Sequence, residues 1–164
     1  GDTSVHEYPT SEQMAEIAIS TARVVRLFGF EPKVAFVSHS TFGQPLTSRT
    51  KHIRKAVDIL KEKKVDFEFD GDMQPDVALN SEYEELYPFS KIVGKANILI
   101  MPGQHSAAIS YKMMKTLGDT KVIGPLLIGL GLPIEIAPLR SSTSELINLA
   151  SIAAYSADVI DYKK

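Results

Sequence analysis

An arginine and a run of hydroxyl side chains stand together near the end of the chain. The stretch APLRSSTSEL, residues 137–146, places Arg140 directly before Ser141, Ser142 and Thr143. A helix N-terminus that offers free amides, hydroxyls and a guanidinium binds phosphate groups. The same residue types also form an ordinary helix cap, in which a hydroxyl accepts a backbone N–H. From the residues alone, an anion site and a helix cap both remain open.

A second hydroxyl-rich stretch, SHSTFGQP, follows a predicted strand at residues 38–45. Ser40 and Thr41 could line a pocket there, and the alternative is a turn that leads into the next helix. His39 has the ring of a general base. No acidic residue lies near it in the sequence to orient that ring, so we interpret His39 as a loop histidine.

A phenol and an amine stand side by side at Tyr111 and Lys112, early in a predicted helix. Together they could face an anion, although a lysine on a helix surface is ordinarily only solvated. Three acidic residues, Asp70, Asp72 and Asp76, lie close together in DGDMQPDVALN. Their spacing does not match a calcium-binding loop, so we interpret them as turn and helix-start residues and expect no metal ligands among them.

Composition limits the function classes. The chain has 164 residues, of which 44% are hydrophobic and 23% charged, as in one globular domain with a real core. A net charge of −2 supplies no general attraction to nucleic acid or to an anionic membrane. No apolar run is long enough to span a bilayer. The absence of cysteine fits a reducing compartment, so we expect a cytoplasmic protein.

Helical and strand patterns alternate along the chain. We expect helices at 10–28, 47–64, 106–118 and 143–162, and strands at 33–38, 65–71, 96–101, 125–131 and 133–138. This alternation predicts an α/β fold with three layers, α/β/α, and a largely parallel sheet. Ligands of such sheets bind at the carboxyl ends of the strands. Three loops are therefore of interest: 38–47, 102–106 and 138–143.

Several motifs together resemble the phosphotransacetylase (phosphate acetyltransferase) family. They are PTSEQMAEIAI, FGFEPKVAFVSHSTFG, DGDMQPDVALN, YPFSKIVGKANILIMP, AISYKMMKTLG and IGPLLIGLGLPI, in the order in which that family has them. The resemblance covers nearly the whole chain and implies a phosphotransacetylase-like fold. It also implies that residues 1–164 are a single domain corresponding to the later half of the family domain. Because the chain opens on Gly1 rather than methionine, we expect it to come from a longer polypeptide.

The family transfers an acetyl group between coenzyme A and phosphate, and its catalytic signature is similar to the stretch around Arg140. That signature runs Ser-Arg-Gly-Cys-Ser, with an aspartate six residues after the arginine. Arg140 retains the arginine, whereas Leu139 stands at the serine position and Leu146 at the aspartate position. Ala108 replaces an asparagine of the family. Leucine cannot accept a proton, so the resemblance implies retained binding without turnover and assigns no catalytic residue.

A related domain forms the C-terminus of hybrid bacterial NADP-dependent malic enzymes, and this chain looks most like that domain. The resemblance implies an acetyl-CoA-sensing regulatory and oligomerisation domain, joined in cis to malic enzyme domains that use NADP and a divalent metal, Mg or Mn. We expect a homodimer or higher homo-oligomer, with the apolar last helix in the contact. The alternative is an active enzyme that converts acetyl-CoA and phosphate into acetyl phosphate and CoA. The expected acetyl-CoA ligands are Arg140, Ser141, Ser142, Thr143, Tyr111, Lys112, Ser40 and Thr41.

Overall fold

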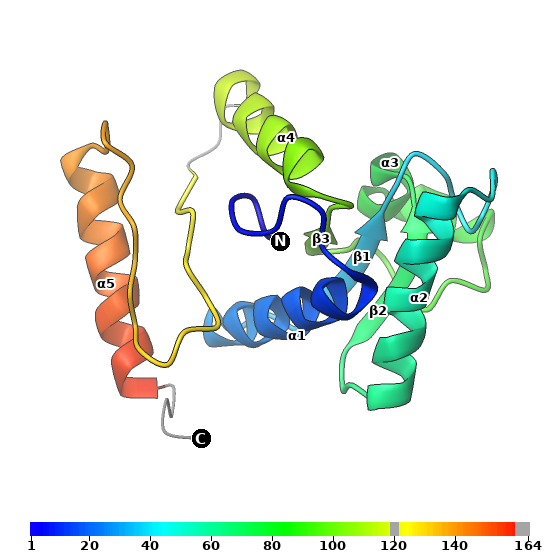
Figure 1. The fold of residues 1–164 in the computed structure, drawn as a ribbon, viewed down its shortest axis with the longest axis horizontal. Coiled ribbons are helices and arrows are strands. Elements are labelled where there is room, and N and C mark those ends of the chain that lie inside the picture. Colours follow the sequence, from blue (N-terminus) through cyan, green and yellow to red (C-terminus); the bar gives the residue numbers. More distant parts are fainter. Residues whose placement is uncertain (119–121, 160–164) are drawn as a thin grey trace. The chain divides into compact units, whose positions relative to one another are not determined.

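The computed structural model describes residues 1–118 and 122–159 of the chain (Figure 1). The chain divides into two compact units, Gly1–Tyr111 and Lys112–Lys164. The boundary falls inside helix α4, Gln104–Leu117, which begins in the first unit and ends in the second.

A three-stranded parallel sheet forms the centre of the first unit. Its strands are β1 (Lys33–Val37), β2 (Glu68–Met73) and β3 (Ile98–Ile100), and their spatial order is β2-β1-β3. The strand at 33–38 was predicted closely. Both neighbours run parallel to β1, so the predicted α/β class with a parallel sheet is confirmed. The order of the strands reverses at β1, which is where open parallel sheets usually bind ligands.

Helices cover both faces of this sheet. Helices α1 (Ser11–Leu27) and α2 (Ser48–Lys63) pack on one face, where Met14, Phe36 and Ile53 are buried in one cluster. The other face carries a smaller cluster that includes Val37, with the short helix α3 (Pro75–Leu79) beside it. A short 3₁₀ helix, Ser81–Glu85, follows α3. The first unit thus has the predicted α/β/α layers.

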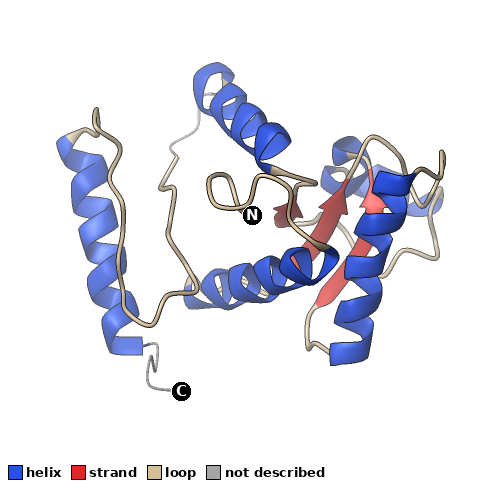
Figure 2. Ribbon diagram, in the orientation of Figure 1, coloured by secondary structure: helices blue, strands red, loops and turns tan. Residues whose placement is uncertain are grey.

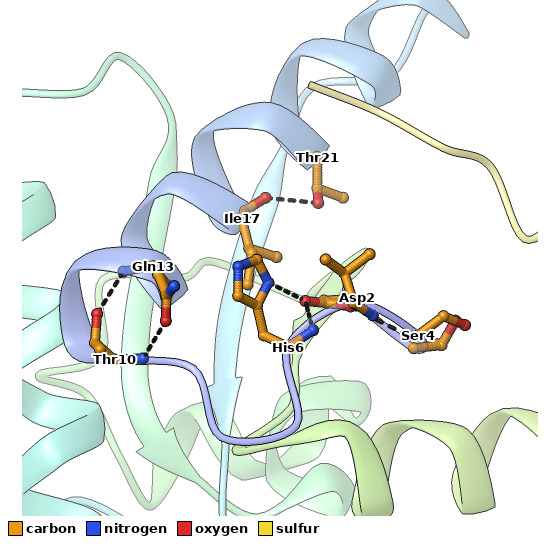
Figure 3. A network of polar contacts seen from close by, with 9 residues as sticks. Asp2, Ser4, His6, Thr10, Gln13, Ile17 and Thr21 are labelled. Atoms are coloured by element: carbon orange, nitrogen blue, oxygen red, sulfur yellow. Dashed lines mark hydrogen bonds and ion pairs between the residues drawn. The ribbon is translucent and has the colours of Figure 1, made fainter. Parts of the chain in front are cut away.

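Helix starts agree with the sequence where a local capping signal is present. The Thr10 hydroxyl accepts the Gln13 N–H at 3.2 Å, and the Gln13 side chain accepts the Thr10 N–H at 2.8 Å (Figure 3). This is a complete capping box, and α1 begins at the next residue. Thr47 caps α2 in the same way with Thr50. Both helix starts follow from side chains only three residues apart.

The second strand differs from the expectation. Strand β2 runs from Glu68 to Met73 and passes through Gly71, which was predicted to end it. Asp70 and Asp72 therefore lie within the strand, and their interpretation as turn residues is wrong. Gly71 permits this continuation because its φ is +149°, and a Cβ there would lie 2.6 Å from the Phe36 carbonyl oxygen. Only Asp76, in the first turn of α3, has the predicted helix-start role.

The second unit contains the end of α4 and helix α5, Thr143–Val159. The last helix was predicted to reach residue 162, and that predicted end lies outside the described residues. Residues 122–142 form no strand, although two were predicted at 125–131 and 133–138 (Figure 2). A strand needs a hydrogen-bonded neighbour, and none of the described residues supplies one to this segment. Leu149 is the only buried residue of α5 in the structure.

Within the part of the chain that the structure describes, no helix combines the length and apolar character needed to cross a membrane.

Candidate functional site

The loop after β1 is tied to the end of β2 by backbone hydrogen bonds. The Ser38 N–H donates to the Met73 carbonyl at 2.9 Å, and the Phe42 N–H donates to the Asp72 carbonyl at 2.6 Å. Both strands end here because the next residues turn toward α2 and α3. The predicted ligand-binding loop therefore lies at the carboxyl end of the sheet, held in place by its neighbouring strand.

Ser40 and Asp72 form a buried polar pair beneath this loop. Both side chains are fully buried, and the Ser40 hydroxyl donates to Oδ2 of Asp72. The Gly43 N–H also points to Oδ2, at 3.4 Å. The second carboxyl oxygen, Oδ1, is buried and has no hydrogen-bond partner among the described residues. The Ser40 hydroxyl is thus directed into the protein, and the Asp72 carboxyl group anchors the loop.

Thr41 is also engaged within the loop. Its hydroxyl accepts the Gln74 N–H at 3.2 Å, and its side chain is mostly buried. The Gln74 side chain in turn donates to the carbonyl of His39 at 3.1 Å. His39 itself is exposed, and its ring lies 3.5 Å from the Ser38 hydroxyl. These contacts fix the backbone of the loop. The side chain of His39 lies on the outer, solvent-exposed side of the loop.

The second predicted site lies at the start of α5, and its geometry is that of a capping box. The Ser142 N–H donates to the Glu145 carboxylate at 2.7 Å, and the Glu145 N–H donates to the Ser142 hydroxyl at 3.3 Å. These reciprocal bonds identify Ser142 as the residue that caps α5. Ser141 is engaged as well, because its hydroxyl donates to the Pro138 carbonyl at 2.8 Å.

Glu145 brings a negative charge to this helix N-terminus. The hydrogen bond from the Ser142 N–H and the ion pair with Lys115 lower the pKa of Glu145 to about 2. The Lys115 ammonium lies 3.1 Å from the carboxylate and joins α4 to α5 within the second unit. A carboxylate here is stabilised by the helix dipole, as an external anion would be. Glu145 therefore already binds the Ser142 amide and hydroxyl, two of the groups that the sequence suggested for an external anion.

Arg140 stands outside this box. It is exposed, and no hydrogen bond or ion pair engages its guanidinium among the residues the structure describes. Thr143, the first residue of α5, is exposed too. Arg140 and Thr143 are thus the members of the predicted group whose polar side chains remain available to an external phosphate, whereas Ser141 and Ser142 are used internally.

The predicted site residues belong to both units. Ser40, Thr41 and Tyr111 lie in the first, and Lys112 lies with the residues from Arg140 to Thr143 in the second. Tyr111 is half-buried and Lys112 is exposed. Lys112 precedes Lys115 by three residues, so both amines lie on one side of α4. Lys115 reaches Glu145, and Lys112 therefore adds positive charge to the same side of the helix.

Three polar residues of these sites were missed in the sequence. Glu145 had a usable signal, because it stands three residues after Ser142 as a capping box requires. Lys115 had none beyond its place on a helix. Asp72 was misjudged because it was assigned to a turn, whereas an acidic residue at the carboxyl end of a buried strand lies at the edge where ligands bind.

An aspartate and a histidine near the start of the chain form another pair that the sequence did not suggest. The His6 ring nitrogen Nδ1 lies 2.6 Å from Oδ2 of Asp2 (Figure 3). Burial alone would raise the pKa of Asp2, but hydrogen bonds from the Val5 N–H, the His6 ring and the Ser4 N–H together lower it. The pair folds the segment before α1 back on itself.

No group of three or more acidic, histidine or cysteine side chains in the described residues could hold a metal ion.

Comparison with known proteins identifies the family. The family model described as phosphate acetyl/butaryl transferase matches residues 1–154. The chain belongs to this family. The predicted resemblance to phosphotransacetylases is therefore confirmed. The family match covers both units, including the loop after β1 and the start of α5.

Two curated relatives of the chain carry the names of different enzymes. An NADP-dependent malic enzyme of Rhizobium meliloti is 50% identical over 156 residues, which are 95% of this chain and 20% of that protein. A phosphate acetyltransferase of Clostridium acetobutylicum is 35% identical over 158 residues, which are 95% of this chain and 47% of that protein. The chain thus spans about a fifth of one relative and about half of the other.

Among solved structures, a phosphotransacetylase from Streptococcus pyogenes has a TM-score of 0.91 at 33% sequence identity. The match covers 96% of this chain and 48% of that one. The phosphotransacetylase-like fold is therefore established for nearly the whole length of this family member.

Proposed function

We propose that this chain is an acetyl-CoA-sensing regulatory and oligomerisation domain of an NADP-dependent malic enzyme, working in the cytoplasm and without acetyltransferase activity of its own. The identity to the malic enzyme of Rhizobium meliloti, 50%, supports this parent over the phosphate acetyltransferase of Clostridium acetobutylicum, at 35%. The parent would decarboxylate malate oxidatively to pyruvate, using NADP and Mg or Mn on domains outside these residues.

The pair of leucines beside Arg140 is the observation that carries the proposal. Leu139 and Leu146 stand where the family signature has a serine and an aspartate. Both side chains are exposed, at 106% and 48% of their reference areas, so neither is retained for packing within the chain. Neither can orient a thiol or accept its proton. A site that keeps the arginine and loses both partners is suited to binding and lacks the groups for proton transfer.

Arg140 supplies the charge that a CoA phosphate needs. Its guanidinium has no partner among the described residues, so it can form a forked pair of hydrogen bonds with phosphate oxygens. Such a charge-assisted bond contributes about 1.5–3 kcal/mol. Lys112 adds a second positive side chain in the same unit. Thr143 offers an exposed hydroxyl at the start of α5, beside the cap that Ser142 forms with Glu145.

Regulation requires that acetyl-CoA bind two quaternary states with different affinity. Helix α5 is the element we assign to that contact between subunits. Only Leu149 is buried in it, while Ile147 and Tyr155 are more than half exposed. An apolar helix left this exposed gains stability by packing against a second subunit in a homodimer or higher oligomer.

The second candidate function is an active phosphate acetyltransferase. It is favoured by the structural match to the Streptococcus pyogenes phosphotransacetylase, with a TM-score of 0.91. In this reading, polypeptide outside residues 1–164 supplies the proton-transfer groups that Leu139 and Leu146 lack.

Two measurements on the full-length gene product separate the candidates. Isothermal titration with acetyl-CoA is expected to show saturable binding, and an acetyl phosphate assay is expected to show no turnover above the uncatalysed rate. Acetyl phosphate formation that Arg140→Ala abolishes would overturn the regulatory proposal in favour of the enzyme. Absence of both binding and turnover at millimolar acetyl-CoA would leave only the oligomerisation role.

A further inference from the structure

A cleft of about 420 Å³ opens at the amino ends of strands β1 and β2. Its apolar lining consists of Pro32, Val65, Phe67 and Phe69. The rings of Phe67 and Phe69 lie edge to face, with their centroids 6.0 Å apart. Val65 and Phe67 are only half-buried, so apolar surface faces the cleft. The volume lies within the range of small-molecule pockets.

Two ion pairs hold the walls of this cleft. The Arg26 guanidinium donates to both carboxylate oxygens of Asp66, at 2.9 and 3.0 Å. The Lys33 ammonium lies 3.6 Å from the Glu68 carboxylate, which also accepts the Val93 N–H at 2.9 Å. The charges of Asp66, Lys33 and Glu68 are thus balanced by neighbours within the chain. Their side chains fix the start of each strand, and the cleft is formed before any ligand arrives.

Two other charged groups at the cleft remain available. Lys91 is exposed, and within the part of the chain that the structure describes no hydrogen bond or ion pair engages its ammonium group. Its backbone is held in place, because the Lys91 N–H donates to the buried Asp70 carboxylate at 2.8 Å. The Glu31 side chain is 85% exposed, and its carboxylate lies 3.9 Å from an Arg26 guanidinium that is already bound to Asp66. The cleft therefore offers one ammonium and one carboxylate beside an apolar lining.

We propose that this cleft binds a free amino acid with an apolar side chain. The Lys91 ammonium pairs with the α-carboxylate of the ligand, and the Glu31 carboxylate accepts hydrogen bonds from its α-ammonium group. The apolar side chain of the ligand packs against Val65 and Phe67 and is removed from water. A phosphate ester fits less well, because its negative charge meets the like charge of Glu31.

The cleft and the predicted acetyl-CoA site are formed by different residues. The cleft lies at the amino ends of the strands, whereas the loop after β1 lies at their carboxyl ends. None of the residues that line the cleft is among the expected acetyl-CoA ligands. The inference thus goes beyond the proposed function, and each can fail while the other holds.

Isothermal titration of the full-length gene product with L-phenylalanine tests the inference, and saturable binding is expected. Hydrocinnamate lacks the ammonium group and phenethylamine lacks the carboxylate, so each is expected to bind at least about tenfold more weakly. Glycine lacks the apolar side chain and is expected to bind more weakly to the same extent. Absence of L-phenylalanine binding at millimolar concentration overturns the inference. Hydrocinnamate that binds as tightly as L-phenylalanine also overturns it, in favour of an apolar carboxylate.

Substitutions of the two charged residues locate the site. Lys91→Gln and Glu31→Gln are each expected to lower the affinity for L-phenylalanine at least about tenfold. Both side chains are exposed, so the fold should be retained. Lys95→Gln is the matched control, since Lys95 is an exposed lysine of the same segment that does not line the cleft, and its affinity should be unchanged. Unchanged affinity in Lys91→Gln or in Glu31→Gln overturns the inference.

One further variant separates this inference from the proposed function. Arg140→Ala is expected to weaken acetyl-CoA binding and to leave the affinity for L-phenylalanine unchanged, because Arg140 does not line the cleft. Loss of L-phenylalanine binding in Arg140→Ala overturns the placement of the amino acid in the cleft.

Discussion

The Glu145 carboxylate accepts two hydrogen bonds from Ser142, one from its amide at 2.7 Å and one from its hydroxyl at 2.9 Å. A residue three positions into α5 thus closes the N-terminus of that helix. The hydroxyl run after Arg140 therefore contains a helix cap, and an anion site there depends on Arg140 and Thr143.

The cap makes the start of α5 sensitive to acid. The pKa of Glu145 in the folded chain is about 2, below its ordinary value of 4.5. A carboxylate with a lowered pKa stabilises the fold above the ordinary value, and its contribution disappears as the pH falls toward 2. Titration of the Glu145 side-chain carbon by NMR is expected to show a midpoint near pH 2. In Lys115→Gln the midpoint is expected to rise only in part, because the Ser142 N–H still donates. A midpoint at 4.5 in the unaltered chain would contradict the capping box.

Removal of the Arg140 guanidinium is expected to weaken acetyl-CoA binding. Arg140→Ala should lower the affinity about tenfold or more, since a charge-assisted bond to phosphate is worth about 1.5–3 kcal/mol. Isothermal titration measures the change. Arg140→Lys keeps the charge but loses the forked geometry, so its affinity is expected to lie between the two.

An exposed arginine on α1 provides the control for this experiment. Arg23→Ala removes the same side chain at a distance in sequence, and it should leave the acetyl-CoA affinity unchanged. Equal affinities for Arg140→Ala and the unaltered chain would remove Arg140 from the site.

Restoring two signature residues is expected not to create a transferase. In the double variant Leu139→Ser, Leu146→Asp the fold should be retained, because both leucines are exposed and an aspartate in the first turns of α5 suits the helix dipole. Ala108 still lacks the amide of the family asparagine. An acetyl phosphate assay is expected to stay at background. Measurable turnover would show that these two positions alone separate the domain from an active enzyme.

The helix starts and the first strand of the first unit could be predicted from the sequence because their determinants are local, whereas the end of β2 could not. Thr10 with Gln13 sets the start of α1, and an apolar run sets β1. The two strands predicted at 125–131 and 133–138 could not form for a physical reason. Their composition is that of strands, but pairing depends on a neighbour, and no pattern within a segment reveals where that neighbour lies.

The candidate site was predictable to a similar extent. The position of Arg140 before a helix was read correctly, whereas the choice of Ser142 as the cap depended on which hydroxyl meets Glu145 in space. The burial of the Ser40 hydroxyl against Asp72 joins residues 32 positions apart. Neither stretch of sequence, taken by itself, indicates that these two side chains meet.

The buried pair beneath the loop after β1 is expected to be energetically coupled. Asp72→Ala leaves the Ser40 hydroxyl buried without its acceptor, and we expect a loss of about 1–3 kcal/mol in the free energy of unfolding. Ser40→Ala removes the donor from a carboxyl group that already has one unpartnered oxygen. The double variant should lose less than the sum of the two, because the Ser40 hydroxyl and the Asp72 carboxyl group are then both absent and neither is left buried without the other.

Urea unfolding followed by circular dichroism measures these differences. Asp76→Ala serves as the control, since Asp76 is exposed at the start of α3, and its effect should stay within about 0.5 kcal/mol. Additive losses in the double variant would show that Ser40 and Asp72 act separately.

Gly71 is expected to tolerate no side chain. Its φ of +149° disfavours other residues, and an added Cβ would lie 2.6 Å from the Phe36 carbonyl oxygen in the neighbouring strand. Gly71→Ala should therefore destabilise the chain by more than about 1 kcal/mol, because both the backbone conformation and the spacing of β1 and β2 oppose it. Gly94→Ala is the comparison, since Gly94 has a φ of +78°, near the left-handed region that other residues can adopt, and open space around it. Gly71→Ala is expected to lose more stability in urea unfolding, because its φ is less accessible to alanine and because the strands approach closely there. Equal losses in the two variants would contradict this expectation, and with it the close approach of β1 and β2 that places Asp72 beneath the loop.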